Sequence, residues 1–271
     1  MSRSSREGQK VVRMGLLQRN RARLETAKQP HLKYFSPISS INLALNRACL
    51  MHFSRGRLLD GGAGHMRNRE LTSGHCDEYE SMDVAPVSEG LDYVCDIQKM
   101  TPIPSDRYDT VLLTHVLEHL PRPGDALKEC FRVLNSQGIL IGSTPHLSRL
   151  HGEPHDYFRF TKYGLAYLLS EVAGFRQWTV FPAGGLLSFL GHQLSTLLVC
   201  STLQLPVVGA AVAHLNYSVL VRMILALDRR VDAGRRIPCM YFFVASRGEF
   251  TASQTEFIHS VPGAVWTESS P

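Results

Sequence analysis

The sequence predicts an α/β fold in which a doubly wound, seven-stranded sheet carries helices on both faces. Three observations predict it: short apolar runs alternate with helical patterns from Arg55 onward, the first three runs end in a carboxylate, and a glycine-rich turn follows the first run. Strands that alternate with helices are typical of parallel sheets with helical crossover connections. The expected strands span residues 56–60, 79–83, 92–96, 108–114, 138–144, 178–181 and 240–246.

Two of the connecting segments have the spacing of amphipathic helices. Residues 123–134 and 161–173 both place apolar side chains three or four positions apart. Thr161 is expected to cap the start of the second helix, and Gly174 to end it.

Composition excludes several classes of protein. The chain has 271 residues, of which 44% are hydrophobic and 20% are charged, so it is not a collagen, a coiled coil or a disordered tail. Its six cysteines contain no C-x-x-C pair, because the closest two, Cys76 and Cys95, are nineteen positions apart. A zinc ribbon or an iron–sulfur cluster is therefore not expected, and a reducing, cytoplasmic location is favoured.

Positive charge is concentrated in an N-terminal arm, residues 1–40. Residues 1–33 hold nine Lys or Arg against Glu7 and Glu25, whereas the whole chain has a net charge of only +5. A basic amphipathic helix here would contact anionic lipid or nucleic acid. The competing interpretation is a frayed, solvated terminus. The basic residues of the expected helix are Arg13, Arg19, Arg21, Arg23 and Lys28.

An apolar helical insert is expected at residues 184–237, before the last strand. Residues 177–221 contain no Asp, Glu, Lys or Arg, and two helices, 186–205 and 207–227, are separated by Pro206. Polar residues interrupt both helices, so we expect a lid, a dimer face or a peripheral membrane contact rather than membrane-spanning helices.

The strongest candidate site begins where the first strand ends. Asp60 is followed by the turn 61–64, whose glycines allow the backbone to approach a ligand closely. Two further acids, Asp83 and Asp96, end the next two strands. In nucleotide-binding α/β folds, an acid at the end of the second strand accepts hydrogen bonds from ribose hydroxyls.

On these motifs the chain resembles the class I S-adenosylmethionine-dependent methyltransferases, which have a Rossmann-like fold, and within them the type 11 group. The carrying motifs are LLDGGAG (58–64), SMD (81–83), VCDI (94–97), residues 109–145, residues 151–175 and CMYFFVASR (239–247). The resemblance implies S-adenosylmethionine as cofactor and assigns a role to each matching position. Asp60 with Gly61, Gly62, Ala63 and Gly64 would hold the methionine part, Asp83 with Val84 the ribose, Asp96 with Ile97 the adenine, and Thr114 and His115 would border the cofactor.

The chain departs from the family pattern at two positions. Met66 stands where the family often has a third glycine, and Gln137 replaces the first glycine of the pair before the fifth strand. Neither change removes a charged contact, so cofactor binding is expected to persist.

A hydroxyl acceptor would need a base, because the sulfonium makes only the methyl carbon reactive. Open α/β sheets bind ligands at the carboxyl ends of their strands, so the expected bases are His151 and His155, after the fifth strand, and His115, after the fourth. No metal is expected. Glu118 and His119 are weaker candidates, because the segment resembles the E-x-x-E-H metal site of ubiquinone-pathway O-methyltransferases, with His115 in place of the first Glu. Hard cations prefer the carboxylate that is missing.

The predicted function is methyl transfer to a small apolar or amphipathic acceptor, such as a lipid, quinone or polyketide-like molecule, with oxygen as the methylated atom. The alternatives are a nucleic-acid methyltransferase and a non-catalytic binding protein that keeps the fold. A nucleic-acid partner is not favoured, because the basic residues lie in the arm rather than around the cleft. A membrane-associated protein and a homodimer remain open. The expected organisation is an arm (1–40), a cofactor domain (41–183 and 238–250), the insert (184–237) and a C-terminal tail (251–271).

Overall fold

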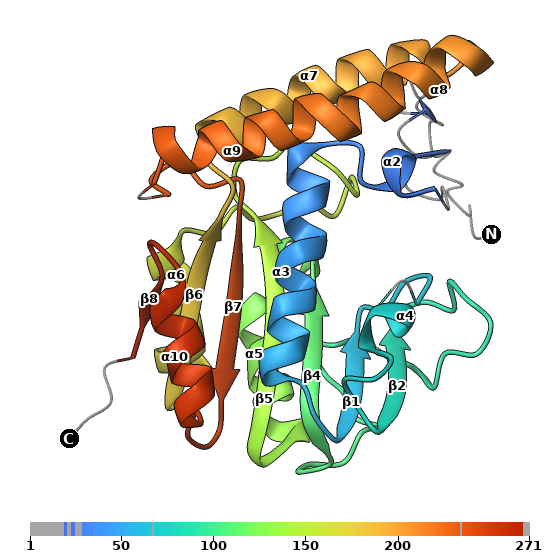
Figure 1. The fold of residues 1–271 in the computed structure, drawn as a ribbon. Coiled ribbons are helices and arrows are strands. Elements are labelled where there is room, and N and C mark those ends of the chain that lie inside the picture. Colours follow the sequence, from blue (N-terminus) through green and yellow to red (C-terminus); the bar gives the residue numbers. More distant parts are fainter. Residues whose placement is uncertain (1–18, 21–22, 25–28, 67, 234, 268–271) are drawn as a thin grey trace, which may run out of the picture.

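A computed structural model describes residues 19–20, 23–24, 29–66, 68–233 and 235–267 (Figure 1). It contains one sheet in which the strands follow the order β3-β2-β1-β4-β5-β7-β6-β8. The strands are β1 (Arg57–Gly61), β2 (Glu78–Asp83), β3 (Tyr93–Val94), β4 (Tyr108–Thr114), β5 (Leu134–Pro145), β6 (Gln177–Ala183), β7 (Met240–Ser246) and β8 (Val265–Trp266). The predicted α/β fold is confirmed.

The first five strands are parallel, and β7 runs antiparallel between β5 and β6. The chain order reverses beside β1, which lies between β2 and β4, as in Asp60 paired with Ser81 and Leu112. Ligands of open α/β sheets bind at such a switch point, outside the carboxyl ends of the strands. The strand order therefore directs attention to the loops after β1 and β4.

Alternating residues of the central strands enter two cores, one on each face of the sheet. Leu59 and Leu113 pack on one face, whereas Leu58 and Leu112 pack on the other. The first core is covered by α5 (Pro123–Val133) and α6 (Lys162–Tyr167), and the second by α3 (Pro37–Phe53) and α10 (Ala252–Ser260), as Figure 1 shows. This alternation is the two-residue period of strands buried on both faces.

The helix boundaries follow their capping residues. The Thr161 side chain accepts a hydrogen bond from the main-chain N–H of Gly164, which confirms the predicted cap of α6. A short π-helix (η2, Leu168–Val172) extends this helix until Gly174, whose φ of +84° is the left-handed conformation that glycine favours at a helix end.

The C-terminal part of the chain differs from the expectation. Residues 251–267 are not a tail: they form α10, which contributes Ile258 to the core, and an eighth strand that pairs with β6. The count of seven strands is therefore wrong by one, because a two-residue strand leaves no alternation to detect. The apolar insert consequently precedes the penultimate strand rather than the last one. The expected boundary after residue 40 also falls inside α3.

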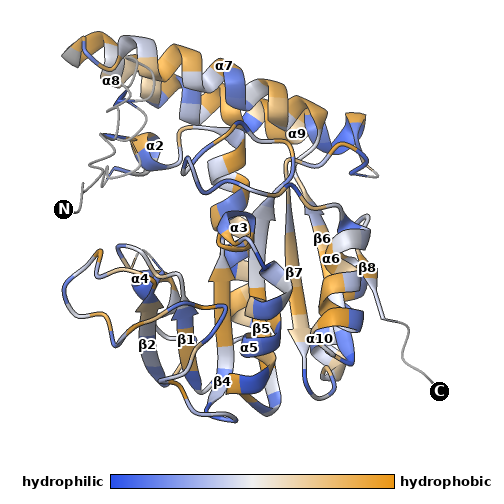
Figure 2. Cartoon of the chain, turned by 180° about the vertical axis from the view of Figure 1, so that it is seen from behind, coloured by the Kyte–Doolittle hydropathy of each residue, from blue (hydrophilic) through white to orange (hydrophobic). Residues whose placement is uncertain are grey.

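The apolar insert forms a helical hairpin above the carboxyl ends of the strands. Its helices are α7 (Leu186–Thr202) and a continuous return segment made of α8 (Pro206–Leu215), a π-helix (η3, Asn216–Val221) and α9 (Arg222–Val231). Figures 1 and 2 show the two arms side by side at one end of the molecule. We call α7 to α9 the hairpin.

One part of the hairpin has the length and composition of a membrane-crossing helix. It is Val207–Val231, 25 residues long, and only 17% of its most apolar window is buried. A helix of the soluble core would be mostly buried. Among the described residues the hairpin is therefore an unusually exposed apolar element.

Short pieces of the N-terminal arm lie against the hairpin. Asn20 and Leu24 are buried, and the Asn20 side-chain amide donates a 2.8 Å hydrogen bond to the carbonyl of Cys200 in α7. This packing differs from a fully solvated arm. The rest of the predicted basic helix, including Arg13, Arg21 and Lys28, lies outside the described residues.

Candidate active site

The turn after β1 forms a cradle of main-chain atoms, Gly61 to Gly64. Gly62 has a φ of +70°, and a Cβ there would lie 2.6 Å from a methyl carbon of Val116. Gly64 has a φ of +54°, but a Cβ there would meet no atom within 4 Å. Glycine is thus required by packing at position 62, whereas position 64 borders open space in which a ligand can lie.

Asp60 is buried directly behind this cradle. Its carboxylate accepts hydrogen bonds from the Tyr79 hydroxyl (2.7 Å) and the Asn68 side-chain amide (3.1 Å). Asn68 also donates to the Thr114 hydroxyl at 3.0 Å, which connects the ends of β1 and β4. Burial raises the pKa of Asp60 to about 6, although the two hydrogen bonds oppose this rise. A cation near the cradle would favour the ionised form.

The second acid is tied to the cradle by a direct hydrogen bond. The main-chain N–H of Gly64 donates to Asp83 at 2.8 Å, and the N–H of Val84 donates to the other carboxylate oxygen at 2.7 Å. The third acid lies further along: Asp96 accepts from the main-chain and side-chain N–H groups of Gln98. Its neighbour Ile97 packs against Gly61, where a Cβ would lie 2.8 Å from the Ile97 side chain. Asp60 and Asp83 therefore adjoin one turn, and Asp96 is linked to it only through the packing of Ile97 on Gly61.

A cavity of about 580 Å³ opens above the cradle, between it and α7 of the hairpin. Five of the expected cofactor residues line it: Gly62, Ala63, Gly64, Thr114 and His115. Asp60, Gly61, Asp83, Val84, Asp96 and Ile97 are not among its lining residues. The cavity wall also includes residues of α3 and α7, such as Asn42, His192 and Gln193, which the sequence interpretation did not assign to the site. These residues are far from the cradle in the sequence, so no local motif marks them. The only signal in the sequence was the charge-free insert, which predicted a lid over the acceptor side of the site.

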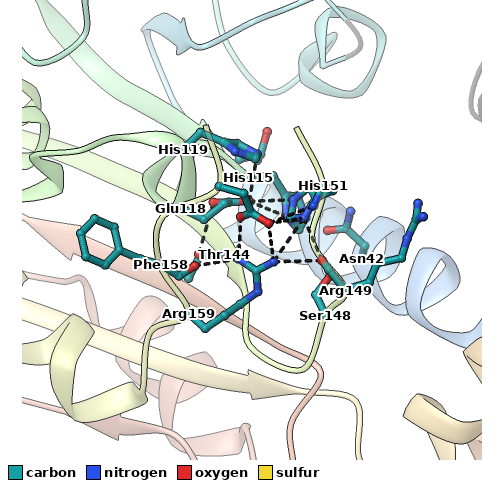
Figure 3. Close-up of polar contacts among 12 residues, drawn as sticks. Asn42, His115, Glu118, His119, Thr144, Ser148, Arg149, His151, Phe158 and Arg159 are labelled. Atoms are coloured by element: carbon teal, nitrogen blue, oxygen red, sulfur yellow. Dashed lines mark hydrogen bonds and ion pairs between the residues drawn. The ribbon is translucent and has the colours of Figure 1, made fainter. Parts of the chain in front are cut away.

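Glu118 is the centre of a cluster of histidines beside this cavity (Figure 3). It lies in a short 3-10 helix (η1, Leu117–His119) and is completely buried. Its Oε1 atom lies 3.5 Å from Nδ1 of His115, 3.8 Å from Nε2 of His119 and 3.7 Å from Nε2 of His151, and it has no hydrogen-bond partner. Its other oxygen, Oε2, accepts a hydrogen bond from the Thr144 hydroxyl at 3.3 Å.

The charge of Glu118 follows from these neighbours. Burial alone would raise its pKa, but the contacts with His115 and His151 outweigh burial and lower the pKa to about 2. The contact with Glu118 also raises the pKa of His151, against an opposing effect of burial. Glu118 is therefore ionised, and the imidazoles of His115, His119 and His151 lie around its carboxylate.

An ion pair fixes the loop that carries His151. Arg159 donates to both oxygens of Asp156, at 2.6 and 2.8 Å, and Asp156 also accepts from the main-chain N–H of His151 at 2.9 Å. The Arg159 side chain lowers the pKa of Asp156 well below its usual range. This pairing confirms the interpretation that Asp156 and Arg159 hold the loop after β5.

The three expected bases, His115, His151 and His155, differ in whether they line the cavity and in which groups their ring nitrogens contact. His115 and His151 line the cavity, whereas His155 does not; its ring lies 3.1 Å from the Tyr157 hydroxyl. Both ring nitrogens of His151 face protein groups, Arg149 on one side and Glu118 on the other. His115 contacts Glu118 through Nδ1, and its Nε2 has no partner among the described residues. His115 also has a φ of +54°, which is rare for a residue other than glycine.

The fold and site define a class of protein, and comparison with known proteins agrees. Residues 59–142 match the family model of a methyltransferase domain. A methyltransferase of Archaeoglobus fulgidus that depends on S-adenosylmethionine is similar in structure, with a TM-score of 0.51 and 18% identity over 76% of this chain and 93% of that one. Phosphoethanolamine N-methyltransferase 2 of Haemonchus contortus has a TM-score of 0.52 and 14% identity over 85% of this chain and 61% of that one.

The fold by itself does not determine the reaction. The [4+2]-cyclase SpnF is equally similar, with a TM-score of 0.50 and 18% identity over 77% of this chain and 80% of that one. No curated protein matches the chain in sequence. The methyltransferase domain match over residues 59–142, together with the fold, supports a class I S-adenosylmethionine-dependent methyltransferase. Methyl transfer from S-adenosylmethionine is the activity that this domain match supports.

Proposed function

We propose that the chain transfers the methyl group to an oxygen atom of a small amphipathic acceptor that it takes from a membrane surface. The observation that carries this proposal is one cavity with two kinds of wall. The glycine cradle and the histidines line it on the side of the sheet, and α3 and α7 line it on the side of the hairpin. An acceptor that enters beneath the hairpin would reach the methyl group there.

For the cofactor we propose the arrangement that the resemblance implies. The roles are Asp60 with Gly61, Gly62, Ala63 and Gly64 for the methionine part, Asp83 with Val84 for the ribose, Asp96 with Ile97 for the adenine, and Thr114 with His115 beside the sulfonium. The open space at Gly64 and the hydrogen bond from Gly64 to Asp83 support it. The sulfonium makes the methyl carbon electrophilic, so the chain mainly has to align the acceptor and exclude water.

We propose His115 as the base that accepts the hydroxyl proton. Its Nδ1 faces the ionised Glu118, which stabilises the imidazolium that forms when Nε2 takes the proton. His151 has both ring nitrogens directed at protein groups and is proposed as a positioning residue. His155 contributes its carbonyl, which accepts a hydrogen bond from the His119 ring.

The polarity of the hairpin supports a membrane as the source of the acceptor. Four of its polar side chains are buried and hydrogen-bonded to one another: Ser195 donates to Asn216 at 2.8 Å, and Ser188 donates to Asp228 at 2.6 Å. Figure 2 shows how many of the hairpin's residues are hydrophobic, and twelve large apolar side chains of the hairpin are exposed. They are Leu190, Leu194, Leu197, Leu198, Leu205, Val207, Val208, Leu215, Val219, Met223, Leu227 and Val231. A helix pair that faces water would show the opposite pattern.

Charge favours an anionic lipid surface over a second copy of the chain. Four arginines of the hairpin and the segment after it are exposed, namely Arg222, Arg229, Arg230 and Arg236. Two copies that met through this face would bring these like charges together, whereas anionic headgroups would neutralise them. Exposed apolar side chains next to basic ones are typical of a protein that lies in the membrane interface.

Two measurements on the purified chain test the proposal. Co-sedimentation with vesicles of phosphatidylcholine and phosphatidylglycerol should bind the wild type, and binding should weaken with salt and with neutral vesicles. Methyl-labelled cofactor with pooled lipid and quinone extracts should then label an O-methyl product, identified by NMR. Binding at the cradle is measured separately with S-adenosylhomocysteine.

Matched variants distinguish a specific loss of membrane binding from a general loss of folding. Leu197→Glu with Val219→Glu should reduce vesicle binding at least tenfold and leave the affinity for S-adenosylhomocysteine unchanged. Met51→Glu, at an equally exposed apolar position of α3, should change neither. A wild-type chain that ignores anionic vesicles but is dimeric, and becomes monomeric in the hairpin variant, would show that a second copy covers this face.

A further inference from the structure

We propose that Glu118, His119 and His151 form a binding site for one divalent transition-metal ion, and that Zn²⁺ fits this set of ligands best. The three residues come from two loops, the one after β4 and the one after β5. One ligand atom from each lies within 4.8 Å of the other two, as drawn in Figure 3. The ligand set consists of two imidazole nitrogens and one carboxylate oxygen.

The hydrogen bonds of the two histidines determine which nitrogens face inward. Nδ1 of His119 lies 2.5 Å from the carbonyl of His155, and Nδ1 of His151 lies 3.2 Å from the carbonyl of Arg149. A carbonyl oxygen can only accept, so Nδ1 of His119 carries a proton and donates it. Nδ1 of His151 also lies 3.4 Å from Nη2 of Arg159, which can only donate, and 3.5 Å from Oδ2 of Asp156; its two acceptor neighbours favour the Nδ1–H form. In the neutral imidazole, Nε2 then presents a lone pair. Both lone pairs are directed toward Glu118.

In this tautomer, three electron-pair donors meet with no hydrogen between them. Glu118 is fully buried, and its Oε1 has no hydrogen-bond partner. A buried carboxylate oxygen without a hydrogen-bond partner costs about 1–3 kcal/mol or more, so a native site with this arrangement calls for an explanation. A cation between the three atoms supplies one. Histidine ligands that donate their second N–H to a carbonyl are also the usual outer arrangement of metal sites.

The distances fit a small transition-metal ion. Bonds of about 2.0–2.2 Å at tetrahedral angles place two ligand atoms about 3.4 Å apart. Oε1 of Glu118 lies 3.8 Å from Nε2 of His119 and 3.7 Å from Nε2 of His151, so small side-chain movements suffice. Two imidazoles and a carboxylate suit Zn²⁺ or Co²⁺, whereas Mg²⁺ and Ca²⁺ prefer oxygen ligands throughout.

The fourth coordination position would open toward the cavity, because His119 and His151 both line it. A site with three protein ligands and one open position is the catalytic type rather than the structural type. Coordination there would lower the pKa of an acceptor hydroxyl and leave His115 free to take its proton. This use of the ion rests on the proposed function, whereas binding of the ion does not.

Binding is tested on the full chain without cofactor or acceptor, so that its result is independent of the proposed function. The chelator-stripped protein is titrated with Co²⁺, and the visible absorption of the bound ion and the zinc content after dialysis are measured. One equivalent should bind. His119→Gln, His151→Gln and Glu118→Gln should each weaken binding at least tenfold, because each removes a ligand.

The control is His155→Ala, which keeps the main-chain carbonyl that orients His119 and should bind the ion as the wild type does. Circular dichroism and thermal unfolding of each variant establish whether it is folded. If the glutamine variants do not fold, the wild-type His119 and His151 resonances must still shift when Zn²⁺ is added. A folded wild type that takes up no Co²⁺ or Zn²⁺, with His151 titrating as an imidazolium, would mean that a proton occupies the cluster and would overturn the proposal.

Discussion

Gly64 donates its main-chain N–H to the Asp83 carboxylate over 2.8 Å, so the glycine turn and the second acid form a single unit. The same carboxylate also accepts from the N–H of Val84. A change at Asp83 therefore affects the shape of the cradle as well as any contact with a ribose.

The first prediction concerns this unit. Asp83→Ala should reduce the affinity for S-adenosylhomocysteine by about 100-fold, because it removes a charged acceptor worth roughly 1.5–3 kcal/mol per hydrogen bond. Isothermal titration calorimetry measures the loss. Asp77→Asn, at an exposed position just before β2, is the matched control and should bind normally. Unchanged affinity in Asp83→Ala would remove this acid from the cofactor site.

The second prediction separates the two left-handed glycines of the cradle. Gly62→Ala should destabilise the fold by about 1–3 kcal/mol, because its Cβ would lie 2.6 Å from Val116. Gly64→Ala should cost less stability, because its Cβ enters open space, but it should weaken cofactor binding more than tenfold. Thermal unfolding with and without S-adenosylhomocysteine distinguishes the two effects. Equal losses of stability and equal binding in the two variants would show that no ligand occupies the space at Gly64.

The third prediction follows from the raised pKa of Asp60, about 6. Because burial favours the neutral form, the contribution of Asp60 to stability is present below its ordinary pKa of 3.8 and is lost as pH rises through 6. A cationic ligand needs the ionised form. The affinity for S-adenosylhomocysteine, which carries an ammonium group, should therefore fall as pH drops below 6, by up to about tenfold per pH unit.

Two comparisons isolate Asp60 from other titrating groups in that experiment. 5′-Methylthioadenosine lacks the ammonium group, so its affinity should depend much less on pH. Asp60→Asn should flatten the pH dependence for S-adenosylhomocysteine. If the slope persists in Asp60→Asn, another group is responsible.

The fourth prediction concerns the proton acceptor. With a hydroxyl acceptor, His115→Gln should lower kcat by about 10²–10⁴ with little change in cofactor affinity, because a base acts only on the acceptor. His155→Ala should stay within about twofold of the wild type, since its ring lies outside the cavity wall. A larger loss in His155→Ala than in His115→Gln would reverse the assignment.

Much of the fold follows from the sequence, because its signals are local. Residues 58 and 59 or 112 and 113 alternate between the two cores, and that alternation is readable along a single strand. The same holds for the cap at Thr161 and for the glycines after Asp60, since a left-handed turn constrains residue type directly. The two-residue β8 has no such signal and forms only because β6 offers it a partner.

The site depended on tertiary structure to a greater extent. Glu118 and His151 belong to different loops, and only the pairing of β4 with β5 and the Asp156–Arg159 ion pair bring them within 3.7 Å. The sequence alone determined which residues could carry charge, accept a proton or turn tightly. Their convergence around one buried carboxylate, and the outward direction of the apolar side of the hairpin, were decided by packing, because distances between separate loops are set by the sheet that joins them.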